Sequence, residues 1–243
     1  MTTTDELRYA IRALARRPVL LIVTTATLSI GIAANGIIFG VVDQLLLRPA
    51  PGLTQPDDLR RVYYDFHREG GKAMSVTTFP VIAALERNVP GMETAAFVNP
   101  EGYTLGAGVD ARGVRVQLVT GNFFTLLGVR PALGRWFRPD ETRIPAGEPV
   151  AVVSAGFWRR ELAESPDVVG RILSINGRPL TVVGVAPDGF TGVDRSPVDV
   201  WVPISTMAEQ QMGATWHNQP NSWWVQAIEI GRASCRERVY VLV

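Results

Sequence analysis

The stretch VLLIVTTATLSIGIAANGIIFGVV, which runs from Val19 to Val42, contains 24 residues without one charged side chain. At the helical rise of about 1.5 Å per residue it would reach about 36 Å, against a hydrocarbon core of about 30 Å. We therefore predict a transmembrane helix within residues 18–47. A cleaved signal peptide is the alternative, but its apolar region usually holds only about 7 to 15 residues.

Basic residues gather on one side of this stretch. The far side, from Asp43 to Asp58, holds three aspartates and one arginine, whereas the near side holds four arginines: Arg8, Arg12, Arg16 and Arg17. Lys and Arg close to a span are retained in the cytoplasm. We therefore expect a cytoplasmic N-terminus at the cell (inner) membrane and a main domain outside it, in the periplasm where the organism has one.

Residues 1–17 are more than a plain tail. Thr4 can cap a helix with acidic residues in its first turn, and its arginines then repeat at intervals of four. This pattern predicts a basic amphipathic helix at the inner membrane surface, in contact with lipid headgroups. A solvated basic flank that only sets the topology is an equal alternative.

Small and polar residues interrupt the apolar stretch at Gly31, Asn35, Gly36 and Gly40. The spacing of Gly36 and Gly40 lets two helices approach closely, and a lone anchor has no need of a polar Asn35. We therefore expect this helix to pack against other transmembrane helices.

The composition narrows the function classes. A net charge of +1 lacks the broad basic excess used in nucleic-acid binding, so no nucleic-acid partner is expected. The single cysteine, Cys235, excludes an internal disulfide framework. Cys235 lies in the stretch 229–243, which we interpret as a non-native tail and leave out of the fold.

The outer region, residues 48–228, mixes strands and short helices. Apolar patterns predict strands at 59–65, 95–98, 114–119, 150–153, 172–175, 180–185, 198–204 and 223–228, and a helix at 77–87. Glycine-rich turns are expected at Gly102, Gly106, Gly108 and Gly113. Without a regular βαβ period, the fold class is α+β.

Caps and turns mark three further elements. Asn122 is expected to cap a short helix that Gly128 ends, and Ser154 to cap a helix that runs through Leu162. Asn176–Gly177 between two β-rich runs predicts a tight hairpin.

No motif in the chain predicts catalysis, a cofactor or a metal site. Ser154 lies between a strand and a helix, but Val152 replaces the first glycine of a nucleophile elbow, so capping explains it better. His67 and His217 have no Cys or His at ligand spacing. The segment Gly70–Lys72 lacks the flanking residues of a phosphate loop. We therefore expect a protein that is not an enzyme, with any ATP hydrolysis supplied by a partner.

Several segments in order resemble MacB/FtsX-type ABC transporter permeases, particularly their duplicated orphan subgroup. The N-terminal segments are Arg8–Arg12, Leu28–Asn35 and Leu46–Pro49. The outer segments resemble the MacB-like periplasmic core domain of that family, and they are Val119–Phe124, Leu127–Arg135, Val168–Arg171, Ile175–Pro187 and Asp199–Pro203.

The resemblance implies a permease subunit for export or mechanotransmission. A cytoplasmic ABC ATPase subunit or domain would drive it, its membrane helices would pair in a dimer, and the outer domain would act on periplasmic substrates, an adaptor or other partners. Members of the family carry further transmembrane helices after the outer domain, so the chain resembles an N-terminal fragment. Two alternatives stay open: an extracytoplasmic regulator of a cell-wall hydrolase, and a membrane-anchored enzyme.

Overall fold

The computed structural model describes residues 18–43, 59–64, 74–89, 91–194, 196–230 and 240–241. The chain divides into two compact units, residues 1–49 and 50–243, and each is described by itself. The expected amphipathic helix of residues 1–17, with its four arginines, lies outside the described residues. So do His67, the Gly70–Lys72 turn and Cys235.

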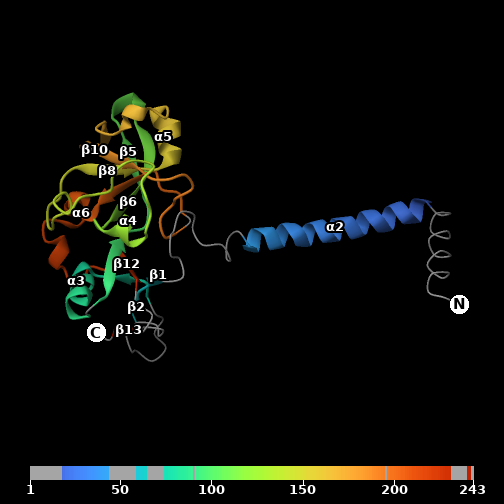
Figure 1. Cartoon of the computed structure of the whole chain (residues 1–243), viewed down its shortest axis with the longest axis horizontal. Helices are drawn as coiled ribbons and strands as arrows, with labels where there is room; N and C mark the ends of the chain where they lie inside the picture. The colour runs from blue at the N-terminus through green and yellow to red at the C-terminus, as the bar shows by residue number, and fades with distance from the viewer. Residues whose placement is uncertain are drawn as a thin grey trace. The chain divides into compact units, whose positions relative to one another are not determined.

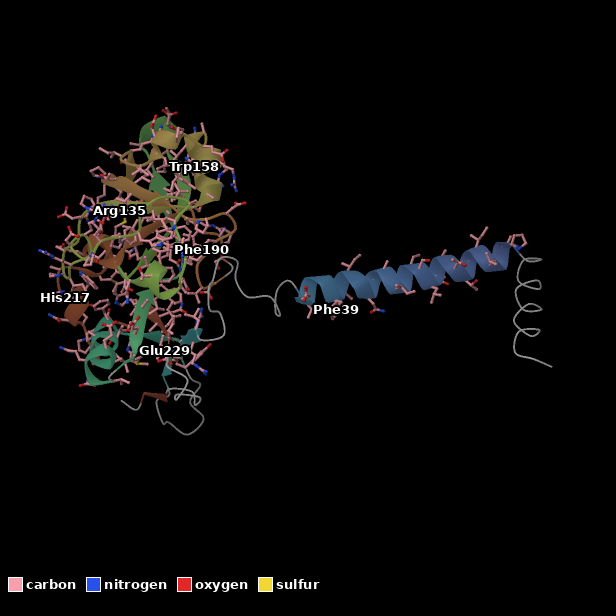
Figure 2. The ribbon with its side chains drawn as sticks, in the orientation of Figure 1. Phe39, Arg135, Trp158, Phe190, His217 and Glu229 are labelled. Carbon is pink, nitrogen blue, oxygen red and sulfur yellow. The ribbon has the colours of Figure 1, made fainter. Side chains whose placement is uncertain are left out.

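The first unit contains α2, a single uninterrupted helix of 25 residues from Pro18 to Val42 (Figure 1). Its segment Leu21–Gly40 is long and apolar enough to cross a membrane by length and composition. Phe39 is 67% exposed and projects from the helix (Figure 2). The hydroxyl of Thr27 donates to the carbonyl of Val23 at 3.0 Å. Such bonds satisfy hydroxyls inside the helix, where lipid would offer no acceptor.

Six strands of the second unit close into a barrel. Their ring order is β6 (Arg112–Val119), β11 (Val200–Pro203), β8 (Val150–Val153), β10 (Arg178–Val185), β9 (Ile172–Ile175) and β5 (Glu101–Leu105), which pairs again with β6. The pairs β6–β11 and β8–β10 are parallel, and the other pairs are antiparallel. β7 (Leu133–Gly134) adds to β10 from outside the ring.

A second group of strands extends the sheet from the barrel. β4 (Glu93–Phe97) joins β6 where Phe97 faces Val119, and β12 (Val225–Ile230) pairs with β4. β12 also pairs with β1 (Leu59–Arg61) and with β3 (Val76–Thr77). β2 (Tyr63–Tyr64) forms a separate parallel pair with β13 (Tyr240–Val241). β12 is therefore the strand on which this extension is built.

Helices and turns cover the two groups of strands. The α-helices are α3 (Phe79–Asn88), α4 (Phe123–Leu126), α5 (Ala155–Leu162) and α6 (Ile204–Met212). Short 3₁₀ turns are η2 (Gly108–Asp110), η3 (Pro166–Val168) and η4 (Trp216–Asn218). α3 lies beside β12 and α5 lies at the opposite end of the domain (Figure 1).

Two hydrophobic cores result from the alternation of side chains along the strands. Alternate residues of the barrel strands share one core, for example Val116, Val153 and Val182. Outward-facing residues such as Val152 and Trp201 share the other core with α4. The second core is rich in aromatic rings, and Phe124 stacks on Trp136 with ring centroids 4.1 Å apart. These buried rings are packing residues of the fold.

Most expected elements are confirmed, with shifts at their ends. The strands at 150–153 and 172–175 have the expected bounds. The hairpin is confirmed, because Asn176 and Gly177 both adopt a positive φ, 48° and 76°. β12 continues to Ile230, two residues beyond the expected strand, so Glu229 and Ile230 of the stretch that was left out of the fold pair with β1 and β4 in the sheet.

Two expectations about turns and caps are wrong. Gly102 and Gly113 lie inside β5 and β6 and face neighbouring strands, so they are not turn residues. The side chain of Asn122 does not cap α4. Its amide donates instead to the carbonyl of Thr94 at 2.7 Å, because that acceptor lies within reach on the adjacent β4. Gly128 does follow the helix with a positive φ of 67°.

Candidate coupling site of the outer domain

The sequence-predicted residues of α2 do not share one face of the helix. At about 100° per residue, Gly36 and Gly40 lie about 40° apart, whereas Gly31 lies about 180° from Gly40. Asn35 lies near Gly31 rather than near the Gly36–Gly40 pair, about 40° away from Gly31. A Cβ atom added at Gly31, Gly36 or Gly40 would meet no atom within 4 Å. Each face has room for a neighbouring helix.

β1 is the first described strand after α2, and its last residue carries an ion pair. The guanidinium of Arg61 donates to Asp194 at 2.5 Å, and the two side chains are 25% and 32% exposed. The same guanidinium lies 5.5 Å from the ring centroid of Phe97, in the aromatic core. Arg61 therefore ties the outer edge of the extension both to the 190–194 segment and to the second core.

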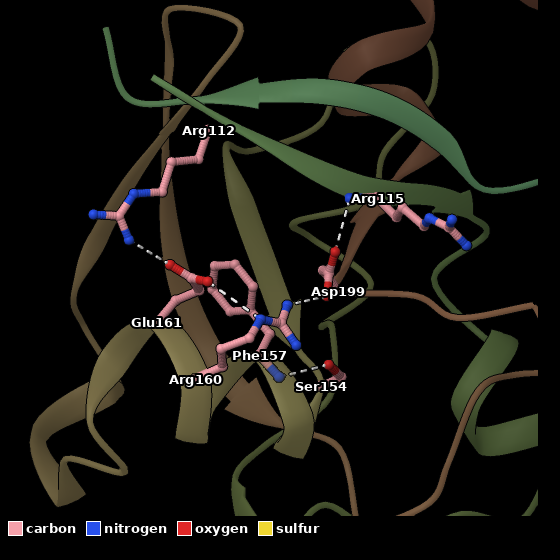
Figure 3. Close-up of polar contacts among 7 residues, drawn as sticks. All are labelled: Arg112, Arg115, Ser154, Phe157, Arg160, Glu161 and Asp199. Carbon is pink, nitrogen blue, oxygen red and sulfur yellow. Dashed lines mark hydrogen bonds and ion pairs between the residues drawn. The ribbon is translucent and has the colours of Figure 1, made fainter. Parts of the chain in front are cut away.

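Asp199 joins three elements at one end of the barrel (Figure 3). Its carboxylate accepts the backbone N–H of Arg115 on β6 at 2.9 Å and the guanidinium of Arg160 on α5 at 2.8 Å. Its backbone carbonyl accepts the N–H of Ser154 at 2.8 Å. The network continues through Glu161, which pairs with Arg160 and with Arg112. Because these partners belong to β6 and to α5 with its cap residue, Asp199 fixes the position of α5 against the barrel.

Ser154 begins α5 within this network. Its hydroxyl accepts the backbone N–H of Phe157 at 3.1 Å, and the residue is 8% exposed. The predicted capping role is therefore confirmed.

The segment that follows β7 is held by a two-point ion pair. Arg135 donates to both oxygens of Glu141, at 2.8 and 2.5 Å, and the backbone N–H of Arg138 also donates to this carboxylate. These bonds, led by the one from Arg135, hold the pKa of Glu141 below its ordinary value, although burial opposes them. The pair fixes the 135–141 segment against the aromatic core.

The pKa of Glu229 on β12 is shifted in the opposite direction to that of Glu141. It is 3% exposed, and burial raises the pKa of its carboxyl group, while Arg60, directly opposite on β1, lowers it. Ionisation of Glu229 inside the extension therefore carries a cost in desolvation.

No group of three or more His, Cys, Asp or Glu residues in the described part of the chain could hold a metal ion. His217 lies in η4, where its ring contacts Trp216. The sequence did not identify Arg61, Asp194 or Glu141 as site residues. Arg61 and Asp194 lie far apart in the chain. Glu141 meets Arg135 across a turn that has no sequence signature.

Comparisons with known proteins identify the family. The MacB-like periplasmic core domain matches residues 21–233. The macrolide export ATP-binding/permease protein MacB of Escherichia coli K12 is 32% identical over 102 residues, and its counterpart in Shigella dysenteriae is 31% identical over 101. Each alignment covers 41% of this chain and 15% of the relative, so the chain matches only a small part of those proteins.

Solved structures agree in fold. The periplasmic region of MacB from Actinobacillus actinomycetemcomitans matches with a TM-score of 0.52 at 14% identity, over 74% of this chain and 77% of that one. The extracellular domain of the noncanonic ABC-type transporter YknZ from Gram-positive bacteria matches with a TM-score of 0.51 at 14% identity, over 73% and 84%. With a domain match that spans most of its residues, the chain belongs to the MacB-like periplasmic core domain family of ABC transporter permeases.

Proposed function

We propose that this chain is a permease component of an ABC-type export or mechanotransmission system. Its outer domain would couple movements of membrane helices, driven by a cytoplasmic ATPase, to periplasmic substrates or partners. The family match supports this function, and relatives named ATP-binding/permease proteins support an ATPase as a partner. The apolar α2 ahead of the domain supports a membrane anchor, and the four arginines that precede it in the sequence support a cytoplasmic N-terminus at the inner membrane.

The single observation that carries the coupling role is the ion pair of Arg61 with Asp194. In this proposal, a displacement of α2 is transmitted along the chain to β1, the first described strand that follows it. The Arg61–Asp194 ion pair and the contact of Arg61 with Phe97 hold β1 on the second core. A displacement of β1 is then transmitted to this core and does not separate β1 from β12.

Co-purification tests the proposed function. A tagged full-length protein in its native host is expected to bring down an ABC ATPase. A cell-wall hydrolase without an ATPase would instead support the regulatory alternative, and recovery of neither would contradict the proposal. A reporter that is active only outside the cytoplasm is expected to be active when fused at Ser205 and inactive at Thr3.

The coupling role has a matched control. Asp194→Asn removes the charge of the Arg61 partner, and Asp188→Asn does the same to Arg159, which also donates at 2.5 Å but in an exposed pair. We expect Asp194→Asn to lower export per ATP hydrolysed in the assembled complex and Asp188→Asn to leave it unchanged. Equal coupling in both variants would contradict this role of β1.

A further inference from the structure

A groove runs between α3 and the segment 137–144, with a volume of about 480 Å³. This volume lies within the range of about 300 to 1,000 Å³ that small-molecule sites occupy. Phe79, Ile82 and Ala83 of α3 line one side, and Phe137 and Ile144 belong to the other. Most of the lining is therefore apolar, and we call this space the α3 groove.

One carboxylate lies among the lining residues of the α3 groove. Glu86 contributes it, and no Lys, Arg or His is among the residues that line this groove. The hydroxyl of Thr94 donates to one oxygen of Glu86 at 2.7 Å. This bond orients the carboxylate and uses a single oxygen, which leaves acceptor capacity for a ligand.

The polar side of the groove is already ordered by its own hydrogen bonds. The carbonyl of Thr94 accepts the amide of Asn122 at 2.7 Å, and the amide oxygen of Asn122 accepts the hydroxyl of Thr120 at 2.9 Å. The Thr120 hydroxyl also accepts the N–H of Ala96 at 3.0 Å. A ligand would meet a preformed surface and would not have to order these groups on binding.

A smaller chamber of about 40 Å³ adjoins the α3 groove, since the two share Phe79, Thr120, Gly121, Thr142 and Ile144. Ser205 lines this chamber, is 5% exposed, and its hydroxyl has no hydrogen-bond partner in the described part of the chain. A buried hydroxyl without a partner is unfavourable by about 1–3 kcal/mol. The Ser205 hydroxyl is enclosed against the backbone of Gly147, so the binding surface of the α3 groove ends before it.

We propose that the α3 groove binds a small organic cation with an apolar body. The cationic group pairs with Glu86, and the apolar body packs against Phe79 and Ile82. An organic anion is disfavoured because its charge would face Glu86 without a compensating base. This binding goes beyond the proposed coupling function and needs no ATPase, so the two proposals fail separately.

Four water-soluble probes of similar size test the site. They are 2-phenylethylammonium, tyramine, 2-phenylethanol and 3-phenylpropanoate, added to the full chain in lipid nanodiscs. Saturation-transfer NMR measures binding, with empty nanodiscs as the blank. We expect the two cations to bind with similar affinity and the anion to give no signal above the blank. Preference for the anion or for the neutral alcohol would overturn the cation assignment.

Matched variants locate the site. Glu86→Gln is expected to weaken 2-phenylethylammonium about two- to fivefold while leaving 2-phenylethanol unchanged, because Glu86 is exposed and exposed ion pairs are weak. Glu93→Gln, on the neighbouring β4, is expected to change neither. Ser205→Ala is expected to change the affinity of neither cation, because its enclosed hydroxyl does not face the groove.

Two bulky substitutions on α3 distinguish binding in the α3 groove from binding elsewhere on the surface. Ala83→Phe adds bulk to a lining residue, and Ala84→Phe adds the same bulk one position along α3, outside the lining. We expect only Ala83→Phe to abolish binding. Equal loss of binding in Ala83→Phe and Ala84→Phe, or no effect of Glu86→Gln, would contradict the site. If only a basic peptide displaced the probes, the groove would bind a protein segment and not a small molecule.

Discussion

Asp199 and Arg115 hold each other by two reciprocal bonds: the Asp199 carboxylate accepts the Arg115 N–H, and the Asp199 N–H donates to the Arg115 carbonyl at 2.9 Å. The carboxylate also accepts Arg160, a side chain that is 58% exposed. We expect Asp199→Ala to lower the free energy of unfolding by about 1–3 kcal/mol, because the N–H of Arg115 loses its acceptor. Asp199→Asn keeps an oxygen for that N–H and should cost less. Denaturant titration of both variants measures the difference, and equal losses would assign the effect to charge alone.

Asn176 closes the barrel between β5 and β9. Its side-chain oxygen accepts the N–H of Thr104 at 2.8 Å, and its backbone has a φ of 48°. Asn176→Gly tolerates that φ but loses the acceptor, so a loss of about 0.5–1.5 kcal/mol is expected. Asn176→Ala loses the acceptor and adds backbone strain, so its loss should be larger by about 1 kcal/mol. Thermal unfolding ranks the two, and an Ala variant at least as stable as the Gly variant would refute this account.

The Arg135–Glu141 pair predicts a loss of stability in acid. Because the folded pKa of Glu141 is lowered, its contribution is fully present above the pKa of an unfolded glutamate and is lost as the pH falls through the folded pKa. Arg135→Gln is therefore expected to lower the Tm at pH 7 and to lower it much less at pH 3. Arg159→Gln, in an exposed pair, is the control and should change the Tm little at either pH. A constant Tm difference across pH would argue against the ion pair.

Glu229 predicts the opposite dependence of stability on pH. Its folded pKa is raised by burial, so its protonated form favours the fold below the pKa of an unfolded glutamate, and this advantage is lost as the pH rises through the folded pKa. We expect Glu229→Gln to raise the Tm at pH 8, with a gain that disappears towards pH 4. Glu93→Gln, at the exposed first position of β4, should give no such gain. A lower Tm at pH 8 would mean that pairing with Arg60 outweighs desolvation.

Helix packing through α2 can be tested face by face. Gly36→Ile with Gly40→Ile adds bulk to one face, and Gly31→Ile adds it about 180° away from Gly40. If the Gly36–Gly40 face contacts a neighbouring helix, the double variant should impair assembly of the full-length protein while membrane insertion is unchanged. Cross-linking in membranes measures assembly, and loss of assembly only with Gly31→Ile would move the contact to the Gly31–Asn35 face.

Local signals in the sequence predicted a large part of this fold. The Asn176–Gly177 turn, the Ser154 cap and the apolar runs of β8 and β9 depend on neighbours in the chain, so the sequence alone identifies them. Gly102 shows the limit of this approach, because a glycine in a strand and a glycine in a turn have the same local signature.

The candidate sites were far less predictable. Asn122 has the residue type of a cap, yet Thr94, 28 positions earlier, takes its amide. Position 121 has no room for a side chain, because a Cβ at Gly121 would lie 2.3 Å from the hydroxyl oxygen of Thr142. Only the fold reveals this requirement for glycine. The pairs of Arg61 with Asp194 and of Glu86 with Thr94 depend on the path of the chain between them.

The central place of β12 in the extension has a consequence for biosynthesis. Leu59 and Glu93 both face Ile230, which is made about 170 and 140 residues later, respectively. Contacts between such distant segments form slowly, and an unpaired strand edge can template wrong pairings in the meantime. Until the ribosome has passed Ile230, β1 and β4 lack their shared partner. Assembly of the extension therefore waits for the synthesis of β12.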